Sequence, residues 1–287
     1  MDQARLFWCA AATLLLAACG GGGGEPEPAP TPAPAPAPAP APTPSPTPAP
    51  TPAPTPAPAP GVLPVVGAGP ASDCFSARGY DAQATSIAVY QETDALGAST
   101  QFRVSTLGRG ETVFNQQRAR AQGEYVARPV GAPESFRTLR YVQIEGLDIL
   151  LVGTSSVPLT PEGNPSTLET VITHAAPLPR DKSFTLAPGG SHVTSYAAVT
   201  GNPGNTTTTP YTVTTHYLGQ EMLTVLGKPY ETCKFQSFDS RSASFTVNWY
   251  ARAEALRGII VRTEGRTSAG PFVRDLVMGY NGTLFAP

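Results

Sequence analysis

The chain has 287 residues, of which 40% are hydrophobic, and a formal net charge of −2. Because no basic stripe accompanies this near-neutral balance, nucleic acids and anionic membrane surfaces are poor candidates as partners. About 220 residues at the C-terminal side have an ordinary mixture of polar and apolar residues, enough for one domain with a substantial core.

Residues 1–18 have the three parts of an export signal. A short polar start with Arg5 precedes an apolar run from Leu6 to Leu16, and the small residues Ala17 and Ala18 follow. The run is well short of the about 20 apolar residues that a membrane-spanning helix needs. We therefore expect a removable signal peptide and no transmembrane anchor.

The stretch Leu16-Ala17-Ala18-Cys19-Gly20 resembles the processing site of bacterial lipoproteins. The resemblance implies a diacylglyceryl group and palmitate-type acyl chains on the thiol of Cys19, which would become the first residue of the mature chain. Several acyl chains hold a protein persistently on a bilayer, because each buried methylene adds about 0.8 kcal/mol. The alternative is an ordinary signal peptide with an unmodified thiol. Gly20 lacks the acidic character associated with inner-membrane retention, so we expect the outer membrane.

A tether follows the lipidation site. Residues 19–24 comprise Cys19 and five glycines, which predict a hinge, and proline occupies every even position from Pro26 to Pro60. Proline fixes φ, donates no hydrogen bond and keeps the preceding residue extended. Residues 25–60 are therefore expected to be a disordered polyproline II linker that reaches about 110 Å. A ligand for proline-recognising modules is the less favoured alternative, since Ala and Thr fill most other positions.

The four cysteines leave one pair for the folded part. Cys9 belongs to the signal peptide and Cys19 is the expected lipidation site, so Cys74 and Cys233 remain. In an oxidising envelope compartment a disulfide between them would stabilise the domain by about 5 kcal/mol in the loop-entropy model. Two buried free thiols are the alternative. A metal site is not expected, because neither cysteine has another Cys or a His at ligand spacing.

Residues 61–287 are expected to form a single β-rich domain. Apolar residues recur there with a period of two and are rich in Val, Ile, Tyr and Phe, and Phe245, Val247 and Trp249 give the cleanest alternation. Strands are predicted around Ile87–Val89, Phe102–Val104, 136–145, 147–153, 193–199, Tyr211–Tyr217, 221–226, 230–238, Phe245–Trp249, 257–264 and 272–280. Only Asn115–Gln122 carries several helix formers, and we expect one or two exposed helical turns there.

The predicted fold class is all-β, with one large antiparallel meander. Such a sheet buries one face either by curling into a half-barrel or by folding into a two-layer sandwich. The curled form would enclose an apolar interior suited to a lipid-like ligand, whereas the sandwich would be filled with side chains. The sequence leaves both open. Trp249 and Tyr250 point to opposite faces of one strand, and core packing is the favoured role of Trp249.

A family resemblance appears in the C-terminal half. The segment Glu221–Phe235, which reads EMLTVLGKPYETCKF, precedes Asn248-Trp249-Tyr250-Ala251, a strand at Gly258–Val261 and Asp275-Leu276-Val277. In this order the motifs resemble a group of uncharacterised proteobacterial envelope lipoproteins, whose early cysteine is matched by Asp73-Cys74-Phe75. The chain departs from the group at Arg252–Gly258, where Gly-x-Gly is usual. The resemblance covers most of residues 71–280 and implies a β-rich domain with a Cys74–Cys233 bond, without any activity.

Motifs of known catalytic sites are missing from the sequence of the domain. It has no Gly-x-Ser-x-Gly elbow, no His-Glu-x-x-His and no phosphate-binding glycine loop. Its histidines are widely spaced, and its carboxylates are expected to be solvated. These residues are His174, His192 and His216, and Asp73, Glu145, Asp148, Glu221 and Asp275. Glu145 and Asp148 alone are close in sequence, on either side of a turn at Gly146.

These features predict a non-enzymatic lipoprotein of the cell envelope. It would be held on the membrane through the lipid on Cys19 and would present its β-domain on a stiff stalk, and the sequence leaves open whether the domain faces the periplasm or outward. Its role would be structural, or it would bind an apolar ligand or an envelope protein. No catalytic residue, cofactor, metal or nucleic acid is expected. The alternative is a hydrolase-type enzyme with a site assembled from the scattered carboxylates or histidines.

Overall fold

The structure is a computed structural model that describes residues 61–166, 169–202, 205–241, 244–267, 270–280 and 284–285. The predicted signal peptide, the lipidation site Cys19, the glycine hinge and the proline-rich linker lie outside these residues. The described residues belong to one compact unit, Thr55–Pro287. None of the helical segments described is long and apolar enough to cross a bilayer.

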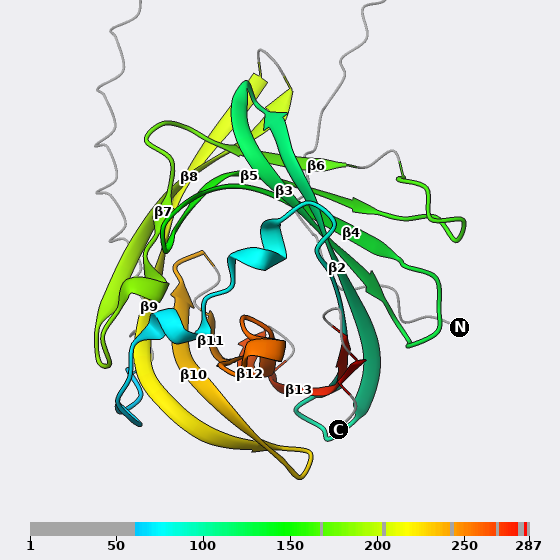
Figure 1. Ribbon diagram of the computed structural model, residues 1–287. Helices are drawn as coiled ribbons and strands as arrows, with labels where there is room; N and C mark the ends of the chain where they lie inside the picture. The colour runs from blue at the N-terminus through cyan, green and yellow to red at the C-terminus, as the bar shows by residue number, and fades with distance from the viewer. Residues whose placement is uncertain are drawn as a thin grey trace, which may run out of the picture. The chain divides into compact units, whose positions relative to one another are not determined.

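The described part of the chain is an antiparallel β-structure without an α-helix, which confirms the all-β prediction (Figure 1). Its strands are β1 (Thr85–Thr93), β2 (Ser99–Phe114), β3 (Gln117–Ala127), β4 (Phe136–Glu145), β5 (Asp148–Pro158), β6 (Thr170–His174), β7 (Arg180–Asp181), β8 (Ser191–Asn202), β9 (Asn205–Val225), β10 (Lys228–Asp239), β11 (Ser244–Ala251), β12 (Ile260–Thr267), β13 (Gly270–Tyr280) and β14 (Leu284–Phe285). Four 3₁₀ turns accompany them: η1 (Ala71–Cys74), η2 (Ala77–Tyr80), η3 (Ser183–Thr185) and η4 (Glu254–Leu256).

The sheet closes on itself. Each strand pairs with its neighbours in sequence, except that β7 pairs only with β5, and β1 pairs with both β2 and β13. Tyr90 of β1 lies opposite Phe102 on one side and Leu276 on the other. Among the described strands, β1–β6 and β8–β13 thus form a barrel-like ring of twelve. A closed ring, rather than two packed layers, is the way in which this meander buries one face.

The predicted helical turns at Asn115–Gln122 are wrong. Asn115 and Gln116 form a tight turn with positive φ, and β3 begins at Gln117. In β3, Ala119, Ala121 and Gly123 alternate with Arg118, Arg120, Gln122 and Glu124. Ala, Arg, Gln and Glu favour helices locally. Pairing with β2 and β4 overrides this preference, because the alternation places small residues on one face and charged residues on the other.

An N-terminal segment, residues 61–84, crosses the ring before the first strand (Figure 1). It begins beside β9 and β10, where the Val66 N–H donates to the Leu218 carbonyl (2.8 Å). It ends beside β2 and β3, where Gln122 Nε2 donates to the Gly79 carbonyl (2.7 Å). Between these points a disulfide joins Cys74 to Cys233 of β10, with 6.1 Å between the Cα atoms.

The apolar core is divided into three clusters, and two of them include residues of this segment. One contains the disulfide with Tyr217 and Phe235, and a second contains Tyr80, Val142 and Ile149. The third surrounds Trp249, which is 4% exposed, as its predicted core role requires. The N-terminal segment and the 3₁₀ turns therefore supply much of the apolar packing between distant strands.

Candidate ligand-binding site

The strand register identifies the inner face of the ring. Gln122 of β3 and Cys233 of β10 both contact the N-terminal segment, which crosses the ring, so their side chains face inward. Paired residues of antiparallel strands share a face, and so do alternate residues along a strand. Arg140 of β4 pairs with Gln122, and Tyr250 of β11 pairs with Cys233, so both belong to the inner face.

Arg140 is the centre of a cluster drawn from well-separated elements. Its guanidinium interacts electrostatically with Tyr80 of η2, Tyr250 of β11, Tyr196 of β8 and Glu124 of β3. Tyr80 raises the pKa of Arg140 most strongly, burial opposes this, and the other three groups raise the pKa further. Side chains from β3, β4, β8, β11 and η2 thus converge on one region inside the ring.

Solvent reaches this region. The side chains of Arg140 and Glu124 are exposed, although both lie on the inner face. The tyrosines 196 and 250 and the inward-facing Thr154 are only half-buried. In a barrel filled with side chains such positions would be buried. The interior around Arg140 is therefore hydrated and polar, which differs from the apolar interior expected of a lipid-binding form.

Arg140 and Glu124 are not engaged by their neighbours. Within the described ranges neither side chain makes a hydrogen bond or an ion pair at contact distance, and their interaction is electrostatic only. Two other arginines of the interior are paired. Arg274 donates to Glu92 (2.7 Å), and Arg241 donates to Asp239 (2.6 Å). The charge of Arg140 is thus available to a ligand, whereas the other pairs hold the wall together.

An aromatic ladder forms one wall of the same interior. His174 lies against Tyr196 with ring centroids 5.5 Å apart, and Tyr196 stacks on Tyr211 at 4.6 Å. The Arg241 guanidinium covers the other face of Tyr211 at 3.7 Å. Burial lowers the pKa of His174, and its Nδ1 has no hydrogen-bond partner among the described residues.

The tyrosines near Arg140 are neutral at physiological pH. Burial raises the pKa of Tyr196 to about 12, with Asp181 acting in the same direction. Burial also raises the pKa of Tyr250 to about 12. Each phenol therefore keeps its proton and is able to donate a hydrogen bond.

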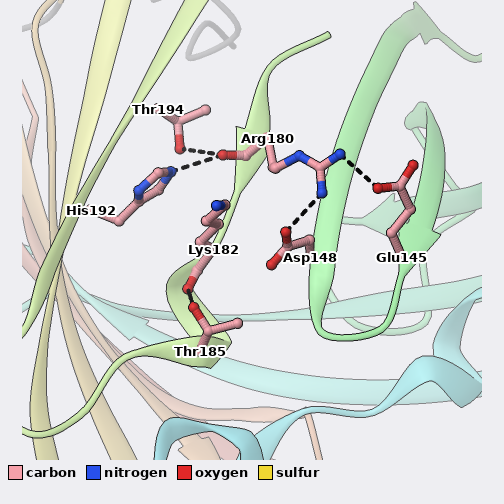
Figure 2. Close-up of polar contacts among 7 residues, drawn as sticks. All are labelled: Glu145, Asp148, Arg180, Lys182, Thr185, His192 and Thr194. Carbon is pink, nitrogen blue, oxygen red and sulfur yellow. Dashed lines mark hydrogen bonds and ion pairs between the residues drawn. The ribbon is translucent and has the colours of Figure 1, made fainter.

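A separate polar cluster surrounds Arg180 of β7, as Figure 2 shows. Its guanidinium donates to Asp148 (2.8 Å) and to Glu145 (2.6 Å), which flank the β4–β5 turn. Its carbonyl accepts from His192 Nε2 at 2.8 Å, with Thr194 Oγ1 at 3.5 Å. The hydrogen bonds that it donates to Asp148 and Glu145 raise the pKa of Arg180. The cluster ties β7 to the β4–β5 hairpin and to β8, so it has a structural role.

The carboxylates that were predicted to be solvated have side-chain partners in the structure. Glu145 and Asp148 share Arg180, and Asp73 accepts from Gln220 Nε2 at 2.9 Å. Glu221 accepts from the Trp249 indole N–H (2.5 Å) and pairs with Lys234 (3.3 Å). Asp275 lies 3.6 Å from Arg262. Side-chain packing on the sheet, which spacing along the chain does not reveal, brings these partners together.

The histidines are not brought into one group. His174 lies on β6, His192 on β8 and His216 on β9, and each has different neighbours. Over the described ranges, no three His, Cys, Asp or Glu side chains lie close enough together to hold a metal ion.

An open pocket of about 450 Å³ lies further along β3 and β4. Its lining includes Arg118, Arg120 and Val142, and Arg120 is paired with Asp81 at 3.1 Å. Tyr80 lies between this pocket and the Arg140 cluster, because it packs against Val142 and interacts with Arg140. The pocket lacks converging aromatic groups, so the Arg140 cluster is the stronger candidate site.

Arg140 carries no signal of its own in the sequence, where it is one charged residue within a predicted strand. The charged positions of β3 are the signal that could have located this interior, although they were predicted to form helical turns. Their alternation with Ala and Gly marks a strand with a polar face, and that face lines the interior.

Comparison with known proteins gives limited information. No protein-family model and no curated protein matches the chain. A crystal structure described as a candidate lipoprotein from Parabacteroides distasonis aligns with 13% identity and a TM-score of 0.33, covering 72% of this chain and 98% of the other. A candidate exported protein with a YmcC-like fold from Bacteroides fragilis aligns with 12% identity and a TM-score of 0.35, covering 69% and 96%. At these TM-scores the similarities support no functional argument.

Proposed function

We propose that the chain is a lipid-anchored protein of the bacterial cell envelope whose closed β-domain binds a ligand rather than catalysing a reaction. The anchoring is inferred from the motif Leu16-Ala17-Ala18-Cys19, which lies at the end of a short apolar run. The thiol of Cys19 is the attachment point for lipid, and the outer membrane is the proposed destination.

The tether supports a display role. The glycines 20–24 and the alternating prolines from Pro26 to Pro60 form a spacer of about 110 Å if extended as polyproline II. A spacer of this length holds the domain away from the membrane surface. Such an arrangement suits a protein that meets a ligand or partner within the envelope.

The polar groups of the domain support binding over catalysis. Glu145 and Asp148, the carboxylates closest in sequence, are both bound to Arg180 and are not free for acid and base chemistry. Arg140, by contrast, is a solvent-accessible residue with aromatic neighbours from several elements. A charged group on a rigid sheet with no contact partner suits recognition.

Metabolic labelling with a palmitate analogue tests the anchoring. Wild-type protein is expected to incorporate the label and to fractionate with the outer membrane, and Cys19→Ala is expected to lose both properties. Cys9→Ala is the matched control, since Cys9 lies within the predicted signal peptide and its loss leaves the label unchanged. An absence of label, or equal labelling of Cys19→Ala, would contradict the proposal.

A further inference from the structure

We propose that the hydrated interior around Arg140 binds a small polyhydroxylated anion, such as a sugar acid or a sugar phosphate, with its carboxylate or phosphate against the Arg140 guanidinium. The inference deepens the proposed binding function and depends on it.

The anionic group follows from Arg140. Arg140 is an exposed residue on the inner face of the ring, and its guanidinium, although surrounded by protein, makes no hydrogen bond or ion pair with the residues that the structure describes. A guanidinium presents a planar fork of N–H donors that matches a carboxylate or phosphate. Among the described residues, the carboxylate that interacts with it electrostatically is that of Glu124, which does not reach it at contact distance.

The hydroxyl groups of the ligand follow from the rest of the lining. Glu124 is an exposed acceptor without a partner in the described ranges, and accepts from a ligand O–H. Thr154 pairs with Arg140 across β4 and β5, and Thr138 pairs with Glu124, so hydroxyl side chains flank both charges. This mixture of donors and acceptors favours a polar ligand over an acyl chain, which would leave these groups without partners.

The tyrosines complete the site. Tyr196 and Tyr250 come from β8 and β11 and interact with the same guanidinium. Tyr250 is held by edge contacts with Phe235 (5.5 Å) and Phe184 (5.7 Å), and Tyr196 by its stack on Tyr211. Rings fixed in this way present flat surfaces and phenol donors to a ring-shaped polar ligand at low entropic cost.

Titration calorimetry on the full-length mature protein in detergent tests the inference. The probes are glucuronate, glucose 6-phosphate, neutral glucose and octanoate. Binding of glucuronate or glucose 6-phosphate is expected, and the two identify a carboxylate or a phosphate as the preferred group. Glucose and octanoate are expected to bind at least about tenfold more weakly, since they lack either the charge or the hydroxyl groups.

The matched variants are Arg140→Gln and Arg109→Gln. Arg140→Gln is expected to weaken binding of the preferred anion by about tenfold to a hundredfold. Arg109→Gln is expected to leave anion binding unchanged. Arg109 is an exposed arginine that is hydrogen-bonded to Tyr125, and Tyr125 faces away from the interior because it alternates on β3 with the inward-facing Glu124. Equal melting temperatures of the two variants establish that Arg140→Gln is folded.

Three results would overturn the inference: neither anion binds, glucose or octanoate binds as tightly as the anions, or Arg140→Gln binds like the wild type. Palmitate labelling of the same preparations separates this failure from failure of the proposed function. Labelled protein that binds no anion remains a lipid-anchored protein with a different ligand.

Discussion

Cys74 and Cys233 are separated by 159 residues in sequence, yet their Cα atoms lie 6.1 Å apart and their sulfurs are bonded. The bond joins η1 of the N-terminal segment to the middle of β10. The bond therefore fixes the N-terminal segment, which follows the proposed tether, to β10.

Loss of the disulfide is expected to destabilise the domain. The loop-entropy model gives an upper value of about 5 kcal/mol for a loop of this length, and residual structure in the unfolded chain reduces it. Cys74→Ser with Cys233→Ser is expected to lower the urea midpoint, and a reducing agent is expected to lower the wild-type midpoint equally. A reducing agent without effect on wild-type unfolding would show that the thiols are free.

Close backbone contact between Gly67 and Gly219 predicts a second sensitive position. Gly219 has φ of +111°, and a Cβ placed there would lie 2.1 Å from the Gly67 carbonyl oxygen. Gly219→Ala is expected to cost about 2–4 kcal/mol of unfolding free energy, because backbone atoms must shift. Gly97→Ala is the control, with φ of +82° and no atom within 4 Å of the added methyl, and is expected to cost about 1 kcal/mol. Equal losses would show that the contact contributes nothing.

Removing the charge of Glu92 is expected to lower the stability of the domain, whereas removing that of Asp275 is not. Burial alone would raise the pKa of Glu92, but hydrogen bonds from Arg274 and Arg128 outweigh it and hold the pKa below its usual value. Burial raises the pKa of Asp275 more than Arg262 lowers it. At pH 7, Glu92→Gln is therefore expected to cost about 1–2 kcal/mol, limited by partial exposure, and Asp275→Asn is expected to be neutral or stabilising.

The pH dependence follows from the same shifts. A lowered folded pKa at Glu92 gives stability that is complete above the unfolded value of about 4.3 and is lost as the pH falls through the folded value. The penalty from Glu92→Gln, measured by urea unfolding, is therefore expected to shrink between pH 5 and acid pH of about 2–3. A penalty that is constant with pH would contradict the assigned role of the ion pair.

Three interior tyrosines predict an alkaline transition. Burial raises the pKa of Tyr196, Tyr217 and Tyr250 to about 12, so the folded state favours their neutral forms. Their contribution to stability is complete below the unfolded value near 10 and is lost as the pH rises towards 12. In a phenolate absorbance titration these three are expected to ionise only well above the unperturbed value near 10. Ionisation of all tyrosines near pH 10 in still-folded protein would contradict their burial.

The elements that the sequence revealed best are those with an apolar face. Phe245, Val247 and Trp249 of β11 alternate strictly, and the predicted strand at 136–145 coincides with β4. The strand β3 was missed because Arg118 and Arg120 alternate with alanines, a composition that suits a helix locally. Closure of the ring could not be predicted from the sequence either, since β1 and β13 carry no local signal of their pairing.

The candidate site was less accessible to sequence analysis than the fold. Arg140, Tyr196 and Tyr250 belong to strands far apart in the chain, and no spacing rule connects them. Their convergence depends on the closed ring and on the register of each pair. The motif at Cys19 is different, because a processing site is read along a continuous stretch of chain.

Thiol accessibility tests whether solvent reaches the polar interior around Arg140. Thr154 and Ser155 are neighbours on β5, but Thr154 pairs with Arg140 on the inner face, whereas Ser155 faces the other way and is 3% exposed. In the folded mature protein, Thr154→Cys is expected to react rapidly with a small charged methanethiosulfonate reagent, and Ser155→Cys is expected to react only on unfolding. Protection of Thr154→Cys to the same degree as Ser155→Cys would show a ring filled with side chains and would contradict a ligand site inside it.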